Sequence, residues 1–117
     1  MKMRTSELQG VALDWAVAQC EGLAVEYLND GITLCLLQKS SKRYAPSTNW
    51  AQGGVIIERE GIATWIRYDG DEGWKALMRA YDEDVSGKTP LIAAMRCYIA
   101  EKLGDEVEIP DELKGEK

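Results

Sequence analysis

Apolar residues recur at helical spacing near the beginning of the chain. They cover most of the circumference of a helix from about Glu7 to Glu21. One narrow sector is polar and contains Glu7, Gly10, Asp14 and Glu21. Ser6 and Gln9 match a capping box at the start, and Gly22 suits the left-handed residue that follows a helix end. This pattern predicts a first helix that is covered on two sides.

A second helix is predicted from Thr89 to about Leu103. Thr89 suits the N-cap, and Pro90 suits the first helical position, where its missing N–H costs nothing. Gly104 closes the helix. Its large apolar residues form one stripe, Ile92, Met95, Ile99 and Leu103. A second face carries small residues, Ala93, Cys97 and Ala100, which allow close approach of another backbone.

Two pairs of apolar runs lie between these helices, and turn-forming residues separate the members of each pair. Residues 23–28 and 32–37 flank Asn29-Asp30-Gly31, whose residues tolerate the left-handed conformations of a tight hairpin turn. Residues 62–68 and 74–81 flank a glycine-containing acidic connection. Two β-hairpins are therefore predicted.

The pattern allows alternative structures for two segments and predicts a loop for a third. A helix stays open as an alternative for residues 74–81, and residues 55–60 fit either a short helix or a strand. Residues 38–54 are polar and rich in turn formers, so they predict the longest loop and no long regular element.

Together these elements predict one α+β domain with the order α-β-β-(α)-β-β-α. The two terminal helices are expected to pack across one face of a four-stranded antiparallel sheet, in two layers. A homodimer formed through the apolar helices would cover their spare faces equally well. A chain of 117 residues that is 45% hydrophobic suits one core. We expect the domain to span residues 1–110 and the charged residues 111–117 to fray.

The formal net charge is −6, from 20 acidic and 14 basic residues, so binding to a nucleic-acid backbone is not expected. The chain has no histidine and no C-x-x-C pair, which removes the commonest zinc ligands and the commonest general base. Three widely spaced cysteines suit buried thiols in a reducing cytoplasm. No apolar run approaches the roughly 20 residues of a membrane span, and no signal sequence is evident. We therefore predict a cytoplasmic protein with no cofactor, metal site or catalytic residue identifiable from its sequence.

Two partial motifs near residue 86 do not predict sites. Ser86-Gly87-Lys88-Thr89 resembles the end of a phosphate-binding P-loop, but Asp82 stands where the first glycine belongs, and Pro90 removes a backbone donor. Asp82, Asp84, Ser86 and Gly87 also match part of a calcium-binding loop. That loop lacks its final glutamate, because Ala93 occupies the twelfth position.

The segment from residue 44 to residue 54 is a different kind of candidate, because it places aromatic residues among hydroxyl and amide groups. Such groups combine rigid contact area with directional hydrogen bonds. The candidate binding residues are Tyr44, Ser47, Thr48, Asn49, Trp50, Gln52 and Gly53. The alternative is a loop that Tyr44 and Trp50 attach to the core, with its polar groups satisfying its own backbone.

Three stretches of the chain form a recognisable pattern: TSELQGVALDWAVAQCEG at 5–22, YAPSTNWAQGGVIIEREGI at 44–62 and TPLIAAMRCYIAEKLGDEVEIP at 89–110. In this order they resemble the NinX-like proteins of lambdoid phages and of prophages in enteric bacteria. The middle of the chain, 65–86, departs more from the family pattern. The resemblance implies a small phage accessory protein that acts inside the bacterial host. The function of the family is unknown, so no catalytic residue carries over.

We infer three functional hypotheses. The leading one is a non-enzymatic module that binds a host or phage protein through the loop at 44–54 or the apolar helices. The second is an acidic mimic of nucleic acid that blocks a host DNA-binding protein, using the acids between Asp69 and Asp84. The third is a small hydrolase that uses paired carboxylates.

Overall fold

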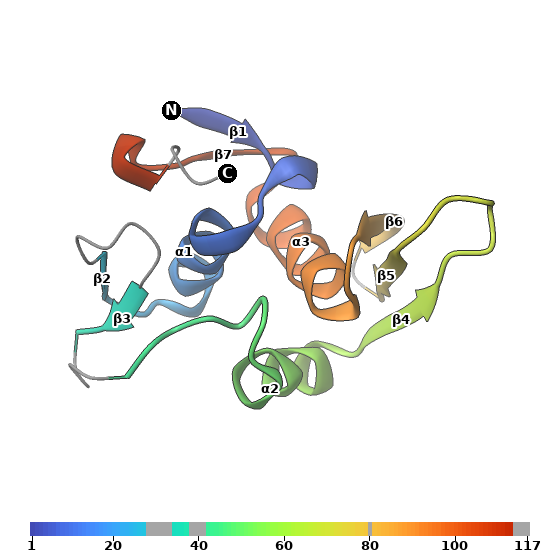
Figure 1. The fold of residues 1–117 in the computed structure, drawn as a ribbon, viewed down its shortest axis with the longest axis horizontal. Helices are drawn as coiled ribbons and strands as arrows, with labels where there is room; N and C mark the ends of the chain where they lie inside the picture. Colours follow the sequence, from blue (N-terminus) through green and yellow to red (C-terminus); the bar gives the residue numbers. More distant parts are fainter. Residues whose placement is uncertain (28–33, 38–41, 80, 114–117) are drawn as a thin grey trace.

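Helix α3, Pro90–Leu103, lies at the centre of the molecule, and the other elements are arranged around it (Figure 1). The computed structural model describes residues 1–27, 34–37, 42–79 and 81–113. The start of α3 is as predicted, because the hydroxyl of Thr89 accepts the N–H of Ile92 at 3.1 Å. Helix α1, Gly10–Glu21, packs on α3, and α2, Trp50–Glu60, contacts α3 as well.

The strands of the described residues form three small antiparallel sheets, and the predicted single four-stranded sheet is wrong. β2, Val25–Tyr27, pairs with β3, Leu34–Leu36. The largest sheet has the order β4-β5-β6 and consists of Ile62–Ile66, Trp74–Met78 and Tyr81–Gly87. The third sheet joins the two ends of the chain, with β1, Lys2–Arg4, beside β7, Glu106–Glu108. The α+β class is confirmed.

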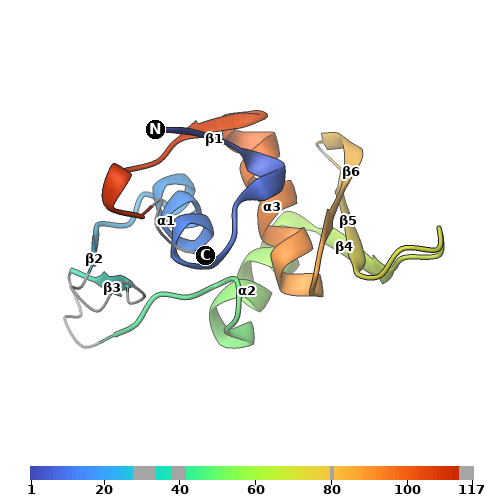
Figure 2. The ribbon, with the colours of Figure 1, turned by 45° about the horizontal axis from the view of Figure 1, so that its top comes forward.

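The predicted two-layer packing is also wrong, because only one terminal helix lies directly on the large sheet. α3 covers the face of β4-β5-β6, and α1 lies on the side of α3 away from that sheet (Figures 1 and 2). Both apolar faces of α3 are thereby covered within one chain. A homodimer is not needed to cover them.

Both predicted hairpins have the expected strand pairing. In the first, Val25 is opposite Leu36, while its expected turn at 29–31 lies outside the described residues. In the second, Ile62 is opposite Met78. The helical alternative for 74–81 is wrong, because five of these residues form β5.

The first helix starts later than predicted. Residues Thr5–Glu7 form a short 3₁₀ turn, and α1 begins at Gly10, whose φ of +59° favours glycine. Gln9 is the N-cap and makes no side-chain hydrogen bond there, so the predicted capping box is absent. Gly22 ends the helix in the left-handed region, as predicted. Asp14, expected on the polar sector, is buried.

The predicted loop at 38–54 is wrong in its last part, because α2 begins at Trp50. The helical alternative for residues 55–60 is confirmed, and the strand alternative is wrong. At the C-terminal end, the first residues of the expected frayed tail form a second 3₁₀ turn, Asp111–Leu113, whose Leu113 is buried. The N-terminal ammonium donates to Ile109 O at 2.8 Å, which holds the two chain ends together.

The core lies mainly between α1, α3 and the residues after β7. Its largest fully buried side chains include Leu8, Leu13, Val17, Met95, Ile99 and Ile109. Full burial of such a side chain contributes about 1.5–3 kcal/mol. Among the described residues, no helix is both long enough and apolar enough to cross a membrane.

One polar cluster joins the three helices at the periphery of this core. Arg59 of α2 donates to both carboxylate oxygens of Glu21 of α1, at 3.0 and 2.6 Å. The hydroxyl of Tyr98 of α3 donates to Glu21 at 2.5 Å and accepts from Arg59 at 3.2 Å. The hydrogen bonds from Arg59 hold the pKa of Glu21 below its usual value.

We predict that Tyr98→Phe lowers the free energy of unfolding by about 1–2 kcal/mol, because the half-buried carboxylate of Glu21 loses its hydroxyl partner. Chemical denaturation measures the change. Tyr68→Phe is the matched control, since Tyr68 is 84% exposed and should change stability by less than about 0.5 kcal/mol. Equal effects of the two substitutions would contradict a structural role for the cluster.

Candidate functional site

The candidate segment begins with residues that are buried against α1. Tyr44, Ala45, Pro46 and Ser47 are all buried. Residues 46–48 form a turn, and the Asn49 N–H donates to Ala45 O at 2.8 Å. Tyr44 therefore attaches the segment to the core, as predicted by the alternative in which this loop is anchored to the core.

Two amides of the segment bond to its own backbone. The Asn49 side chain caps α2 by accepting the Ala51 N–H at 2.8 Å. The Gln52 side chain accepts the Ala45 N–H at 2.7 Å and donates to Arg43 O at 2.8 Å. These bonds fix the path of the chain into α2, so neither amide is fully available to a ligand.

The turn before α2 is held by a buried carboxylate. Asp14 is 6% exposed, and its Oδ1 accepts the Ser47 N–H at 2.8 Å. Burial raises the pKa of Asp14 to about 6, while the hydrogen bonding of Ser47 and the charge of Arg43 act in the opposite direction. This role was not predicted, because Asp14 falls on the sector of the helix that contains most of its polar residues.

Gly53 makes a close helix contact possible. A Cβ added there would clash with the Pro46 carbonyl oxygen and would lie 2.6 Å from Leu91 Cδ2. Gly54 is different, because its added Cβ would make an ordinary 3.6 Å contact with the Trp50 ring. The two adjacent glycines therefore have different structural roles.

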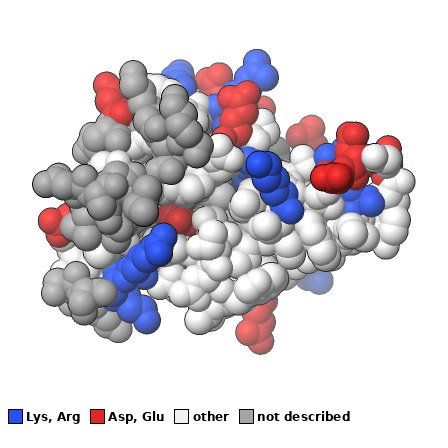
Figure 3. Space-filling view, viewed as in Figure 1, with Lys and Arg blue, Asp and Glu red and all other residues white. Residues whose placement is uncertain are grey.

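The outward side of α2 is apolar. Trp50 is 57% exposed and Val55 is 58% exposed. Ala51 and Gly54 lie on the same side of the helix, and Glu58 is the charged residue at its end. Figure 3 shows a broad area without charged side chains over α2 and the segment that leads into it. We call Trp50, Ala51, Gly54 and Val55 the α2 face.

The structure divides the predicted site residues into two groups. Thr48, Asn49 and Trp50 are exposed, whereas Tyr44, Ser47 and Gly53 are buried and Gln52 is half-buried. The idea that Trp50 attaches the loop to the core is wrong. Val55 was missed, although a helix that begins at Trp50 would have placed it four residues after Ala51, on the same side.

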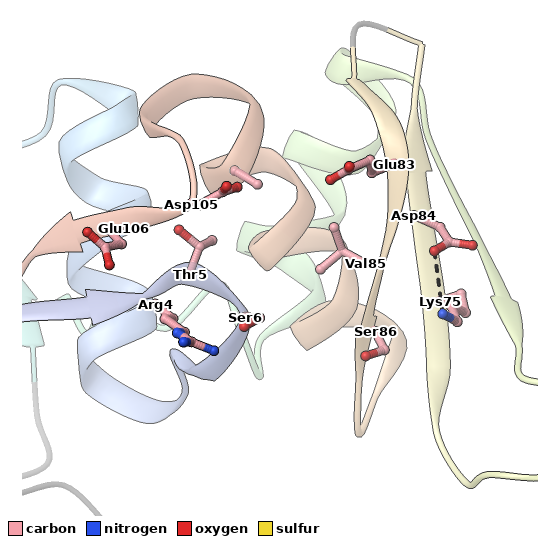
Figure 4. A pocket seen from close by; sticks show the side chains of 11 residues that line it. Arg4, Thr5, Ser6, Lys75, Glu83, Asp84, Val85, Ser86, Asp105 and Glu106 are labelled. Atoms are coloured by element: carbon pink, nitrogen blue, oxygen red, sulfur yellow. Dashed lines mark hydrogen bonds and ion pairs between the residues drawn. The ribbon is translucent and has the colours of Figure 1, made fainter.

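A cleft of about 800 Å³ lies elsewhere, beside the β1–β7 pair (Figure 4). Arg4, Thr5, Ser6, Asp105 and Glu106 line it from one side, and residues of β5 and β6 line the other side. The four carboxylates that line the cleft, those of Glu83, Asp84, Asp105 and Glu106, are exposed. Asp84 also pairs with Lys75 at 3.4 Å. A general acid needs an environment that raises its pKa, usually burial. The cleft therefore gives no particular support to a carboxylate hydrolase.

The acids at the β4–β5 connection are partly neutralised within the chain. Arg67 contacts Asp69 at 2.7 Å and Asp71 at 3.1 Å. Its hydrogen bond to Asp69 lowers the pKa of that carboxyl to about 2. Internal pairing reduces the negative field that a mimic of nucleic acid would present.

Comparison with known proteins identifies the family. The model of the family described as bacteriophage P22 NinX matches residues 4–102. The chain belongs to the NinX family. The match extends from the last residue of β1 almost to the end of α3, so it includes the α2 face and the cluster that joins the helices. No match was found among curated proteins.

For this NinX protein we predict opposite effects of alanine at the two adjacent glycines. Gly53→Ala should destabilise by about 1–3 kcal/mol, because the Pro46 backbone must move. Gly54→Ala should be neutral or should stabilise by up to about 1 kcal/mol, because alanine favours the helix. Thermal and chemical denaturation of both variants provide the comparison. Similar changes in stability in the two variants would show that the close contact at Gly53 does not exclude a Cβ.

The buried Asp14 gives a predicted pH dependence. Its folded pKa of about 6 lies above its ordinary value of 3.8, so the native state holds the extra proton between these values. Its contribution to stability therefore falls as the pH rises from about 4 to about 6. Since one pKa unit corresponds to about 1.4 kcal/mol, the change is at most about 3 kcal/mol.

Asp14→Asn keeps an oxygen acceptor for Ser47 and removes the charge. Relative to wild type, this variant should gain stability as the pH rises from 4 to 7. Denaturant titrations at several pH values measure the difference, in which all other titrating groups cancel. A difference that is constant across this range would contradict the raised pKa.

Proposed function

We propose that this NinX protein is a non-enzymatic binding module that engages a host or phage protein through the α2 face. The observation that carries the proposal is the exposed Trp50 at the start of a rigidly held helix, with exposed Val55 five residues later on the α2 face. Tryptophan is prominent among residues that dominate binding energy at protein interfaces. The partner is expected to present an apolar pocket for the indole.

The bonds beneath the α2 face support this role, because they fix the helix before a partner arrives. The Asn49 cap, the Gln52 contacts and the Asp14–Ser47 bond all restrain the backbone that enters α2. Restraint before binding reduces the conformational entropy lost on association. Several predicted ligand-binding residues would then act by positioning Trp50 and not by contacting the partner.

The proposed setting is the cytoplasm of the bacterial host. Cys20, Cys35 and Cys97 are free thiols, which suits a reducing compartment. Membership in a phage family supports the choice of a host or phage protein as partner. The proposed activity needs no cofactor, and the pairing of Arg67 and Lys75 with neighbouring acids favours this proposal over nucleic-acid mimicry.

The test is a quantitative affinity purification from phage-infected cells with tagged wild-type protein, Trp50→Ala and Tyr68→Ala. Tyr68 is a matched control, because it is an exposed aromatic residue outside the α2 face. Trp50→Ala should weaken binding of a specific partner by about 2 kcal/mol, roughly 30-fold, and Tyr68→Ala should retain it.

Folding of each variant is checked by circular dichroism and thermal denaturation. A folded Trp50→Ala protein that retains every partner at wild-type levels would rule out the α2 face. Loss of the partner only in Tyr68→Ala would place the interface at the end of the β4–β5 hairpin instead.

A further inference from the structure

The guanidinium of Arg96 is half-buried on α3 without a carboxylate partner. Its Nε donates to Leu8 O at 2.8 Å, and its Nη1 donates to Ser86 O at 3.0 Å. Within the described part of the chain, no acid forms an ion pair with it, although the charge of Glu7 acts on it from a greater distance. Burial lowers the pKa of this guanidinium. A partly desolvated cation that is hydrogen-bonded only to neutral carbonyls does not recover all of the free energy lost when its charge leaves water.

Arg96 lines a pocket of about 590 Å³ between the end of β6, the start of α1 and the β4–β5 connection. Lys88, which is exposed, lines the same pocket, as do Gln9 and the apolar residue Ile92. Arg67 also contributes to the wall, but its charge is already paired with Asp69 and Asp71. Arg96 and Lys88 are therefore the cations available to a ligand.

The two carbonyl contacts orient the Arg96 guanidinium and leave its Nη2 without a hydrogen bond to any described residue. Guanidinium groups bind phosphate through several parallel N–H donors, and lysine adds a point charge. A phosphate has enough oxygens to accept from Arg96, Lys88 and the Gln9 amide together. The first-turn N–H groups of α3 contribute little, because Thr89 already accepts those of Ile92 and Ala93.

We propose that this pocket binds the phosphate group of a small phosphorylated molecule, with Arg96 and Lys88 as the binding residues. The volume suits a small molecule, and Ile92 offers apolar contact to its organic part. A nucleic-acid strand fits less well, because the chain carries a net charge of −6 and the acid Glu72 also lines the pocket. The site differs from a P-loop, since side chains and not a glycine-rich backbone hold the phosphate. It is independent of the α2 face.

The test is an NMR titration of the full-length protein with inorganic phosphate at constant ionic strength. The signals followed are the Arg96 Nε–H and the backbone N–H groups of Gly87 and Lys88. We expect saturable shifts at these positions with a Kd on the order of 1 mM, a value typical of so small a ligand. A nucleoside monophosphate titrated in the same way should bind more tightly if the organic part contacts Ile92.

Lys88→Ala should weaken phosphate binding about three- to tenfold, because one charged contact is lost. Lys42→Ala is the matched control, since it removes the same charge from another exposed lysine. Arg96→Lys should weaken binding further, provided that its spectrum remains that of a folded protein. If the spectrum of Arg96→Lys is not that of a folded protein, the comparison of Lys88→Ala with Lys42→Ala decides the question.

Three outcomes would overturn the proposal. One is the absence of saturable shifts at 50-fold above the expected Kd, roughly 50 mM phosphate. Another is equal weakening by Lys88→Ala and Lys42→Ala, which would indicate a general charge effect. The third is tighter binding of a single-stranded oligonucleotide with a steep salt dependence, which would indicate a backbone-binding surface. None of these results bears on the role of Trp50.

Discussion

The burial of α3 on both sides is the constraint on which the rest of the structure depends. Its small residues Ala93 and Cys97 are fully buried and allow the large sheet to approach closely. The approach is tight enough that a Cβ added to Gly87 of β6 would lie 2.6 Å from the Ala93 nitrogen. On the other side, Met95 and Ile99 are fully buried where α1 and the chain ends gather. A change of volume on either side would have to displace an entire layer, because close-packed interiors have little spare room.

The same helix also determines where α2 lies. Leu91, at the start of α3, leaves no room for a side chain at Gly53, and Tyr98, nearer its end, bonds to Glu21, which also binds Arg59 of α2. Contacts near both ends of α2 therefore fix its inner side against α3. On its outer side, Trp50 is 57% exposed. The proposed binding role of the α2 face rests on this exposure on a firmly attached helix.

Local sequence signals predicted the elements whose determinants are local. Thr89-Pro90 and Gly104 define α3, and apolar runs separated by turn formers define the two hairpins. β6 was not predicted, because it contains Asp82, Glu83 and Asp84, which are unfavourable in strands. Its pairing with β5 stabilises the strand despite this composition. The β1–β7 pair depends on residues more than 100 positions apart, for which no local pattern exists.

Residues 44–54 were predicted as a candidate binding segment, and the structural roles of the residues within it were not predicted. Polar composition marked residues 44–54 as a loop, yet Asn49 acts as a helix cap and Gly53 as a point of close packing. Arg96 was overlooked for the opposite reason, since an arginine within an apolar helix normally suggests a solvated residue. Its two carbonyl acceptors connect the segment before α1 to β6, so it contributes to the fold as well. An aliphatic residue of similar length would avoid the cost of partly burying a charge. A cation there shares a pocket with Lys88 and forms no ion pair with a described acid, so a ligand explains its presence better than stability does.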